Sequence, residues 1–169
     1  MRNLLITLFA LVSFSCSTEQ SQVAVPDHVD IHTLTIKKTS TGASIPVLAS
    51  PQVVSSAFGA PSSSVQYYGE LDDITYTKSS YSGLTILFDH AKTAYFDFAT
   101  TEFGLVVNNQ VIRPGNNIST LSSLFPGSYA VRTDGRVFIQ LKAHGVMTDA
   151  GIVIVFNSDN KITRILLVQ

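Results

Sequence analysis

Apolar and polar positions divide the chain into an apolar beginning, a polar stretch and a long region of short alternating segments. Residues 4–14 are apolar except at Thr7 and Ser13, and residues 17–30 show no apolar periodicity. From there to the end, runs of β-branched and aromatic residues alternate with turns rich in Gly, Pro, Asn and Asp, which is the pattern of short β-strands. The strands expected from these runs cover residues 31–38, 65–69, 74–78, 83–89, 93–99, 103–108, 129–132, 137–143, 151–157 and 162–168.

Two segments among these strands carry the spacing of short helices. The first ends at Phe58, with Ser50 as a candidate N-cap and Pro51 at the first helical position. Gly59 and Pro61 follow, and both residue types end helices.

The second helical segment follows Asn117, which is a candidate N-cap, and we expect Pro126-Gly127 to end it. Its apolar residues lie at the spacing of one helical face. They are Ile118, Leu121, Leu124 and Phe125.

The two halves of the chain resemble one another at two landmarks. Gly83–Asp89 recurs as Gly151–Asn157, an offset of 68 residues, and the two helical segments end at Phe58 and Phe125, an offset of 67. Agreement between independent landmarks indicates tandem copies of one supersecondary unit.

These copies predict an α+β domain over residues 31–169, with one copy over about 31–102 and the other over 103–169. In the expected fold, both helices pack on one face of a largely antiparallel sheet. The other sheet face is then left for solvent or for binding.

The chain's beginning indicates export. Residues 1–15 have the charge, apolar stretch and small residues of a signal peptide, and Cys16, the sole cysteine, follows directly. This order resembles a bacterial lipoprotein signal, which implies that Cys16 is lipidated and that residues 16–30 tether the domain to the outer membrane or cell envelope. Such signals usually carry an aliphatic residue where Ser13 stands, so simple secretion is the alternative. The mass of the N-terminal peptide distinguishes the two.

Composition excludes several classes of protein. The chain is 45% hydrophobic and 14% charged, which excludes a disordered chain. Eleven Lys and Arg against twelve Asp and Glu give a net charge of −1, so no basic field for nucleic acid is expected. One cysteine rules out an intrachain disulfide and a thiolate zinc cluster.

The helical segments resemble those of a known superfamily. Ile112–Ile118, with Leu121 and Leu124–Pro126 after it, is similar to the helix entry of small envelope lipoproteins of the SmpA/OmlA and β-lactamase-inhibitory-protein-like (BLIP-like) superfamily. Val54 with Phe58–Pro61 is similar to the end of the same helix. Each copy carries only part of the motif. The resemblance implies a tandem helix-plus-sheet fold that binds other proteins or serves as an assembly scaffold, and it transfers no site residue.

Candidate chemistry is sparse. His28, Asp30 and His32 alternate and would share one face of a strand, which makes them a weak metal-ligand candidate. A solvated polar edge is the interpretation that better fits their place beside the tether. Glu70, with Asp72-Asp73, lacks the spacing of a calcium loop. No serine lies in Gly-x-Ser-x-Gly or Ser-x-x-Lys.

The tyrosines point instead to a binding surface. In the run from Tyr95 to Phe98, Phe96 and Phe98 share one face of a strand, and Tyr95 and Asp97 share the other. Tyrosine-rich faces are typical of protein interfaces. We therefore predict a partner-binding face whose residues are Tyr67, Tyr76, Tyr95 and Asp97. Tyrosines scattered over a surface without a partner are the alternative.

These observations predict a lipid-anchored envelope protein that binds another envelope protein or acts as an assembly or inhibitor module. No cofactor and no catalytic residue are expected. The rival interpretation is an envelope hydrolase with a carboxylate or Ser-His site, which would need a deep pocket where Asp, His or Ser side chains converge.

Overall fold

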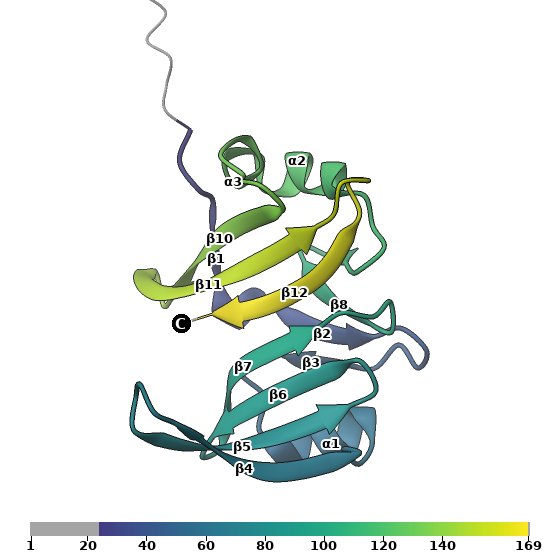
Figure 1. Cartoon of the computed structure of the whole chain (residues 1–169), viewed down its shortest axis with the longest axis vertical. Coiled ribbons are helices and arrows are strands. Elements are labelled where there is room, and N and C mark those ends of the chain that lie inside the picture. Colours follow the sequence, from purple (N-terminus) through teal and green to yellow (C-terminus); the bar gives the residue numbers. More distant parts are fainter. Residues whose placement is uncertain (1–23, 169) are drawn as a thin grey trace, which may run out of the picture.

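Two β-sheets dominate the computed structural model, which describes residues 24–168 (Figure 1). In spatial order, the large sheet contains β1 (His28–Asp30), β10 (Arg136–Ala143), β11 (Val146–Phe156), β12 (Ile162–Val168), β7 (Lys92–Phe98), β6 (Leu84–Asp89), β5 (Ile74–Tyr81) and β4 (Ser63–Gly69). The small sheet contains β3 (Ser44–Pro46), β2 (Thr35–Lys38), β8 (Phe103–Val107) and β9 (Gln110–Ile112). Only β1 runs parallel to its neighbour, β10; the other pairs are antiparallel.

Helices are few and short in the described residues. They are α1 (Pro51–Phe58), α2 (Leu121–Leu124) and α3 (Pro126–Ala130), with 3₁₀ turns at Ile31–Thr33 and Ile118–Thr120. The predicted first helix is confirmed, because the Ser50 side chain accepts a hydrogen bond from the Val53 N–H and Pro51 is the first helical residue.

The α+β prediction with helices on one sheet face is wrong. The fold is mostly β, and the small sheet takes the place that the helices were expected to fill. In Figure 1, α1 and the small sheet lie behind the large sheet. The segments around Ile36 and Leu105 were predicted as strands of different copies, and they pair directly with one another. Pairing across so many residues leaves no local signal in the sequence.

Local steric effects account for the other differences. Phe125 leaves the helical region at φ −141° and ψ 66° because the following Pro126 disfavours the helical conformation. The second helix is therefore cut to one turn, and Pro126 begins α3 over residues that were partly predicted as the strand 129–132. The predicted strand 31–38 begins instead with a 3₁₀ turn. Strands β1, β3 and β9 were not predicted.

The strand order is the same from both edges of the small sheet, and in the large sheet β10, β11 and β12 follow the order of β5, β6 and β7. The outermost strands of the large sheet differ, because β1 is parallel to its neighbour and β4 is antiparallel to its neighbour. The halves of the large sheet meet where β7 pairs with β12, through Phe98 opposite Ile165 and Asp97 opposite Leu166. The halves of the small sheet meet where β2 pairs with β8. In both places the centres of the paired spans lie 68 residues apart, the offset that also relates Gly83 to Gly151.

One apolar core fills the space behind the large sheet. It joins side chains of both sheets and α1, so the described domain is stabilised as a unit. The largest side chains with almost no exposure come from β6, β7, β8 and β2 and their neighbours; they include Phe88, Phe96, Phe98, Phe103, Leu34 and Ile36.

The segment before β1 is fixed to α3 by paired hydrogen bonds. The Asp27 N–H donates to Ser128 Oγ at 2.8 Å, and the Ser128 N–H donates to Asp27 Oδ2 at 2.8 Å. A Cβ at Gly127 would lie 2.3 Å from the Val25 carbonyl oxygen, so only glycine allows this approach. Cys16, the signal segment and the first part of the predicted tether lie outside the described residues.

Candidate functional site

The large sheet turns one set of side chains toward the core and the alternate set away from it. Ile86 and Phe96 are directly opposite and buried, whereas the next pair, Leu87 and Tyr95, is turned the other way. We call this second side the outer face. In Figure 1 it faces the viewer, and no helix or strand of the described residues covers it. Its residues include Val65, Tyr67, Tyr76, Lys78, Thr85, Leu87, Tyr95, Asp97, Phe138, Val153, Val155, Arg164 and Leu166.

All four predicted binding residues lie on the outer face. Tyr67 and Tyr76 are directly opposite one another in β4 and β5, with ring centroids 6.5 Å apart. Asp97, in β7, pairs with Thr85 in the neighbouring strand β6. Tyr76 is only 9% exposed, so little of its side chain is available to contact a partner.

A hollow of about 250 Å³ lies at one end of the outer face. Tyrosine rings form its sides, Leu87 and Ala94 lie in the sheet beside them, and the turn between β4 and β5 supplies Glu70 and Asp72. The remaining lining residues are Tyr67, Gly69, Leu71, Tyr76 and Tyr95.

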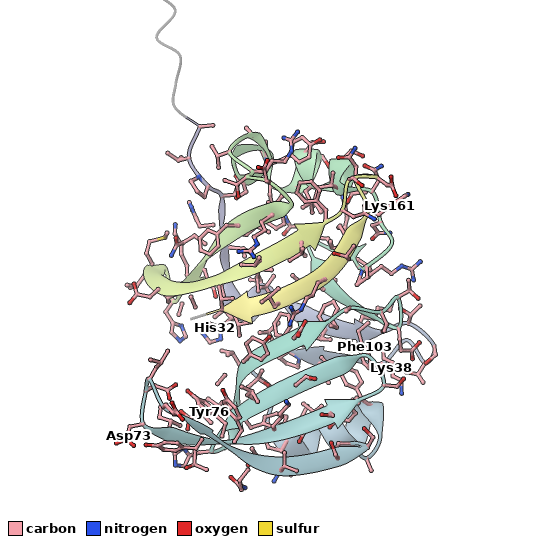
Figure 2. The ribbon with its side chains drawn as sticks, viewed as in Figure 1. His32, Lys38, Asp73, Tyr76, Phe103 and Lys161 are labelled. Carbon is pink, nitrogen blue, oxygen red and sulfur yellow. The ribbon has the colours of Figure 1, made fainter. Side chains whose placement is uncertain are left out.

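Two tyrosines fix the acidic turn in place. The Tyr76 hydroxyl donates a hydrogen bond to the Asp72 carboxylate, and the Tyr68 hydroxyl donates to Asp73 Oδ1 at 2.6 Å. Figure 2 shows Tyr76 and Asp73 near the end of this hairpin. Aromatic faces attract cations, and carboxylates strengthen hydrogen bonds from charged donors. The hollow is therefore suited to a Lys or Arg side chain with an apolar stem.

The hydrogen bond to Asp72, with burial, raises the pKa of Tyr76 to about 12, against an ordinary value of 10.0. Folded protein thus keeps a proton that unfolded protein loses between pH 10 and 12. We expect this contribution to stability to be complete below pH 10 and to be lost as the pH rises toward 12.

The pH effect is measured by urea denaturation between pH 9 and 12, together with the tyrosinate absorbance. The matched variant is Asp72→Asn, which keeps the shape of the side chain and removes its charge. Its stability should fall less steeply over this pH window than that of the unchanged chain. Identical slopes would show that Asp72 does not hold the Tyr76 proton.

Asp97 has a structural partner that the sequence did not indicate. Arg164 Nε donates to Asp97 Oδ1 at 2.7 Å, and Arg164 Nη2 donates to Asp97 Oδ2. These hydrogen bonds raise the pKa of the Arg164 guanidinium above its ordinary value. This bidentate contact crosses the short junction between β7 and β12, where the two strands pair through two residue pairs. Asp97 therefore helps to join the halves of the outer face.

The weak metal candidate is not assembled. Asp30 Oδ1 accepts a hydrogen bond from the His32 N–H at 2.9 Å, which starts a 3₁₀ turn and ends the alternation with His28. The His32 ring lies instead beside His144, with centroids 4.4 Å apart. Within residues 24–168, no group of three or more His, Cys, Asp or Glu side chains is placed to hold a metal ion.

The hollows characterised in residues 24–168 do not bring Ser, His and Asp side chains together. A hollow of about 530 Å³ beside Lys38, Phe58 and Phe103 (Figure 2) includes Ser62 and Glu102 but no histidine among its described lining residues. His90 contacts Asp89 in an exposed turn, with no serine in that contact. The hydrolase interpretation therefore stays an alternative prediction, without support from these contacts.

Sequence analysis missed the half of the outer face that comes from β10–β12. There Phe138 and Leu166 both pair with Val153, and the Phe138 ring lies over Gly151, where a Cβ would be 2.1 Å from Phe138 Cε2. The alternation of apolar residues in these strands carried the signal. In residues 151–156 of β11, however, both alternate sets are largely apolar, so the sequence alone does not show which set faces outward there.

Comparison with protein-family models, curated proteins and solved structures gave no match. The SmpA/OmlA and BLIP-like resemblance therefore stays a prediction from the two helix motifs. Among the described helices, none has the length and apolar character needed to cross a bilayer.

Proposed function

We propose that this chain is a non-catalytic protein-binding module that holds its partner on the outer face of the large sheet. The observation that supports the proposal is the apolar and aromatic character of a sheet face that the rest of the fold leaves uncovered. Val65 is 54% exposed, Tyr67 48% and Phe138 36%. Apolar and aromatic side chains exposed on one uncovered face are typical of interaction sites.

The chemistry of the outer face favours a protein as its partner. Tyrosine, phenylalanine and arginine are enriched at protein interfaces, and the hollow beside Tyr95 is large enough to receive one anchoring side chain. Glu70 and Asp72 at that hollow favour a basic anchor. The site thus combines an apolar contact area with a local preference for positive charge.

Site-specific photo-crosslinking in cells of the protein's source tests the proposal. A photoreactive amino acid at position 87 or 138 should give the same covalent product, because both positions lie on the outer face. Val53 and Val111 are matched controls, since they are 45% and 39% exposed and lie in α1 and β9. We expect no product at the controls.

A second substitution in the same experiment separates binding from chance contact. Tyr95→Ala in the chain that carries the crosslinker at position 138 should reduce the product at least several-fold, because it opens the hollow at the other end of the face. Equal products at the control positions, or none from the outer face, would contradict the proposal.

We further propose that the module is exported and anchored to the cell envelope by a lipid on Cys16, with an envelope protein as its partner. This part of the proposal rests on the sequence of residues 1–30. The mass of the N-terminal peptide tests it, and an unmodified Cys16 thiol in the secreted protein would contradict it.

A further inference from the structure

Within residues 24–168, the large sheet ends at β4, which has no neighbouring strand on its outer side (Figure 1). Six of its seven residues are exposed and Gly69 is half-buried. The other sheet edges in the described residues are β1, β3 and β9, and each has three residues. Short edge strands are one way in which proteins avoid unwanted pairing. The edge at β4 lacks that protection.

The sequence of β4 carries no other protection either. Its seven residues include no proline and no charged side chain. The pairing with β5 runs through seven consecutive residues, from Ser63 opposite Ser80 to Gly69 opposite Ile74, without a bulge. A long, regular and uncharged edge presents a row of backbone N–H and C=O groups to another strand.

We propose that β4 pairs with β4 of a second copy of this chain, in antiparallel orientation, about a twofold axis beside Gln66. In this register, each of the seven residues of β4 lies opposite a β4 residue of the second copy. It places Gln66 opposite Gln66, Val65 opposite Tyr67, Ser64 opposite Tyr68, and Ser63 opposite Gly69.

The side chains in this register complement one another. Val65 opposite Tyr67 joins a β-branched and an aromatic residue, a favourable cross-strand pair, and the twofold axis produces it twice. Both residues belong to the outer face, so the pairing extends that face across two copies. Tyr68 is 55% exposed and faces the small Ser64, and the two Gln66 amides can bond to one another.

Charge supports a second copy as the occupant. Glu70, Asp72 and Asp73 follow the end of β4. An antiparallel pair keeps the acidic turns of the two copies at opposite ends, so they do not repel one another. The paired span itself contains no like charges, which are destabilising when directly opposite.

Disulfide trapping tests the proposed register. With Cys16→Ser, Gln66→Cys makes residue 66 the sole thiol, and the twofold axis places the two thiols directly opposite. Opposite Cα atoms in antiparallel strands lie ~4.5–5.5 Å apart, within reach of a disulfide. The matched control is Ser63→Cys, because the two residues 63 would lie about 20 Å apart at roughly 3.4 Å per residue. We expect a covalent dimer from the first variant only.

Light scattering on the purified chain tests the association without a crosslink. The paired edge is smaller than a standard interface of about 1,600 Å², so we expect a dimer whose fraction rises with concentration. Gln66→Lys puts two positive charges opposite one another and should give a monomer, whereas Gln52→Lys, at an exposed position of α1, should still dimerise.

Each contrary result would overturn the proposal. In light scattering, the contrary result is a chain that stays monomeric at every concentration. In disulfide trapping, it is equal crosslinking through residues 63 and 66, or a disulfide of the Gln66→Cys variant that forms only with a different protein. The test does not depend on the outer-face partner, so dimerisation and partner binding fail or succeed separately.

Discussion

Phe96→Ala is expected to lower the free energy of unfolding by about 3–5 kcal/mol. The Phe96 side chain has no exposed surface, and its ring stacks on Phe98 with centroids 5.5 Å apart. It lies in β7, next to the junction with β12 that joins the halves of the large sheet. Truncation would leave a cavity where neighbouring strands cannot collapse freely. Urea denaturation followed by circular dichroism measures the loss.

Phe138→Ala is the matched control, because the same atoms are removed from a ring that is 36% exposed. We expect it to cost about 1–2 kcal/mol, since only part of the ring leaves a buried environment. A Phe138→Ala loss as large as that of Phe96→Ala would mean that the outer face is covered in solution. The same variant should weaken the photo-crosslink from position 87.

Ser128→Ala is expected to lower the free energy of unfolding by about 1–3 kcal/mol. Ser128 is fully buried, and its Oγ is the acceptor for the Asp27 N–H. The Asp27 carbonyl in turn accepts from the Gln140 N–H at 3.0 Å, where β1 meets β10. Loss of the hydroxyl removes the acceptor of the Asp27 N–H. Denaturation measures the global loss, and faster amide exchange at the Asp27 N–H would locate it.

Ser122→Ala is the control for this prediction. Its Oγ donates a hydrogen bond to the Ser119 carbonyl at 2.7 Å, and the side chain is exposed on a short helix. Water replaces such a bond, so the change should stay within about 0.5 kcal/mol. Equal effects of the two substitutions would show that Asp27 and Ser128 do not fix the segment before β1.

Most of the individual strands were predictable because their residues repeat every two positions. The strand predicted over residues 162–168 has the bounds of β12, and the cap at Ser50 with Pro51 predicted α1 correctly. These signals are local, since a strand's alternation and a helix's cap depend on neighbours within a few residues. The sheet partners of Ile36 and Leu105 depend on contacts across half of the chain and had no such signal.

The candidate site was predictable to a similar degree. Alternation around Tyr95 placed Tyr95 and Asp97 on the side opposite Phe96, and the strand register agrees. The burial of Tyr76 depends on its hydrogen bond to Asp72 and on its cross-strand contact with Tyr67. The ion pair of Asp97 depends on Arg164, which is 67 residues away in sequence.

The sequence by itself determined where most strands form, which of their side chains alternate, and that an apolar segment over residues 4–14 precedes Cys16. Tertiary structure alone decided that a second sheet covers the core and that, within the part of the chain that the structure describes, the outer face is uncovered and β4 is an edge strand. The physical reason is that periodicity fixes which residues share a face, whereas burial of a face depends on what packs against it. That packing joins residues that no local pattern relates.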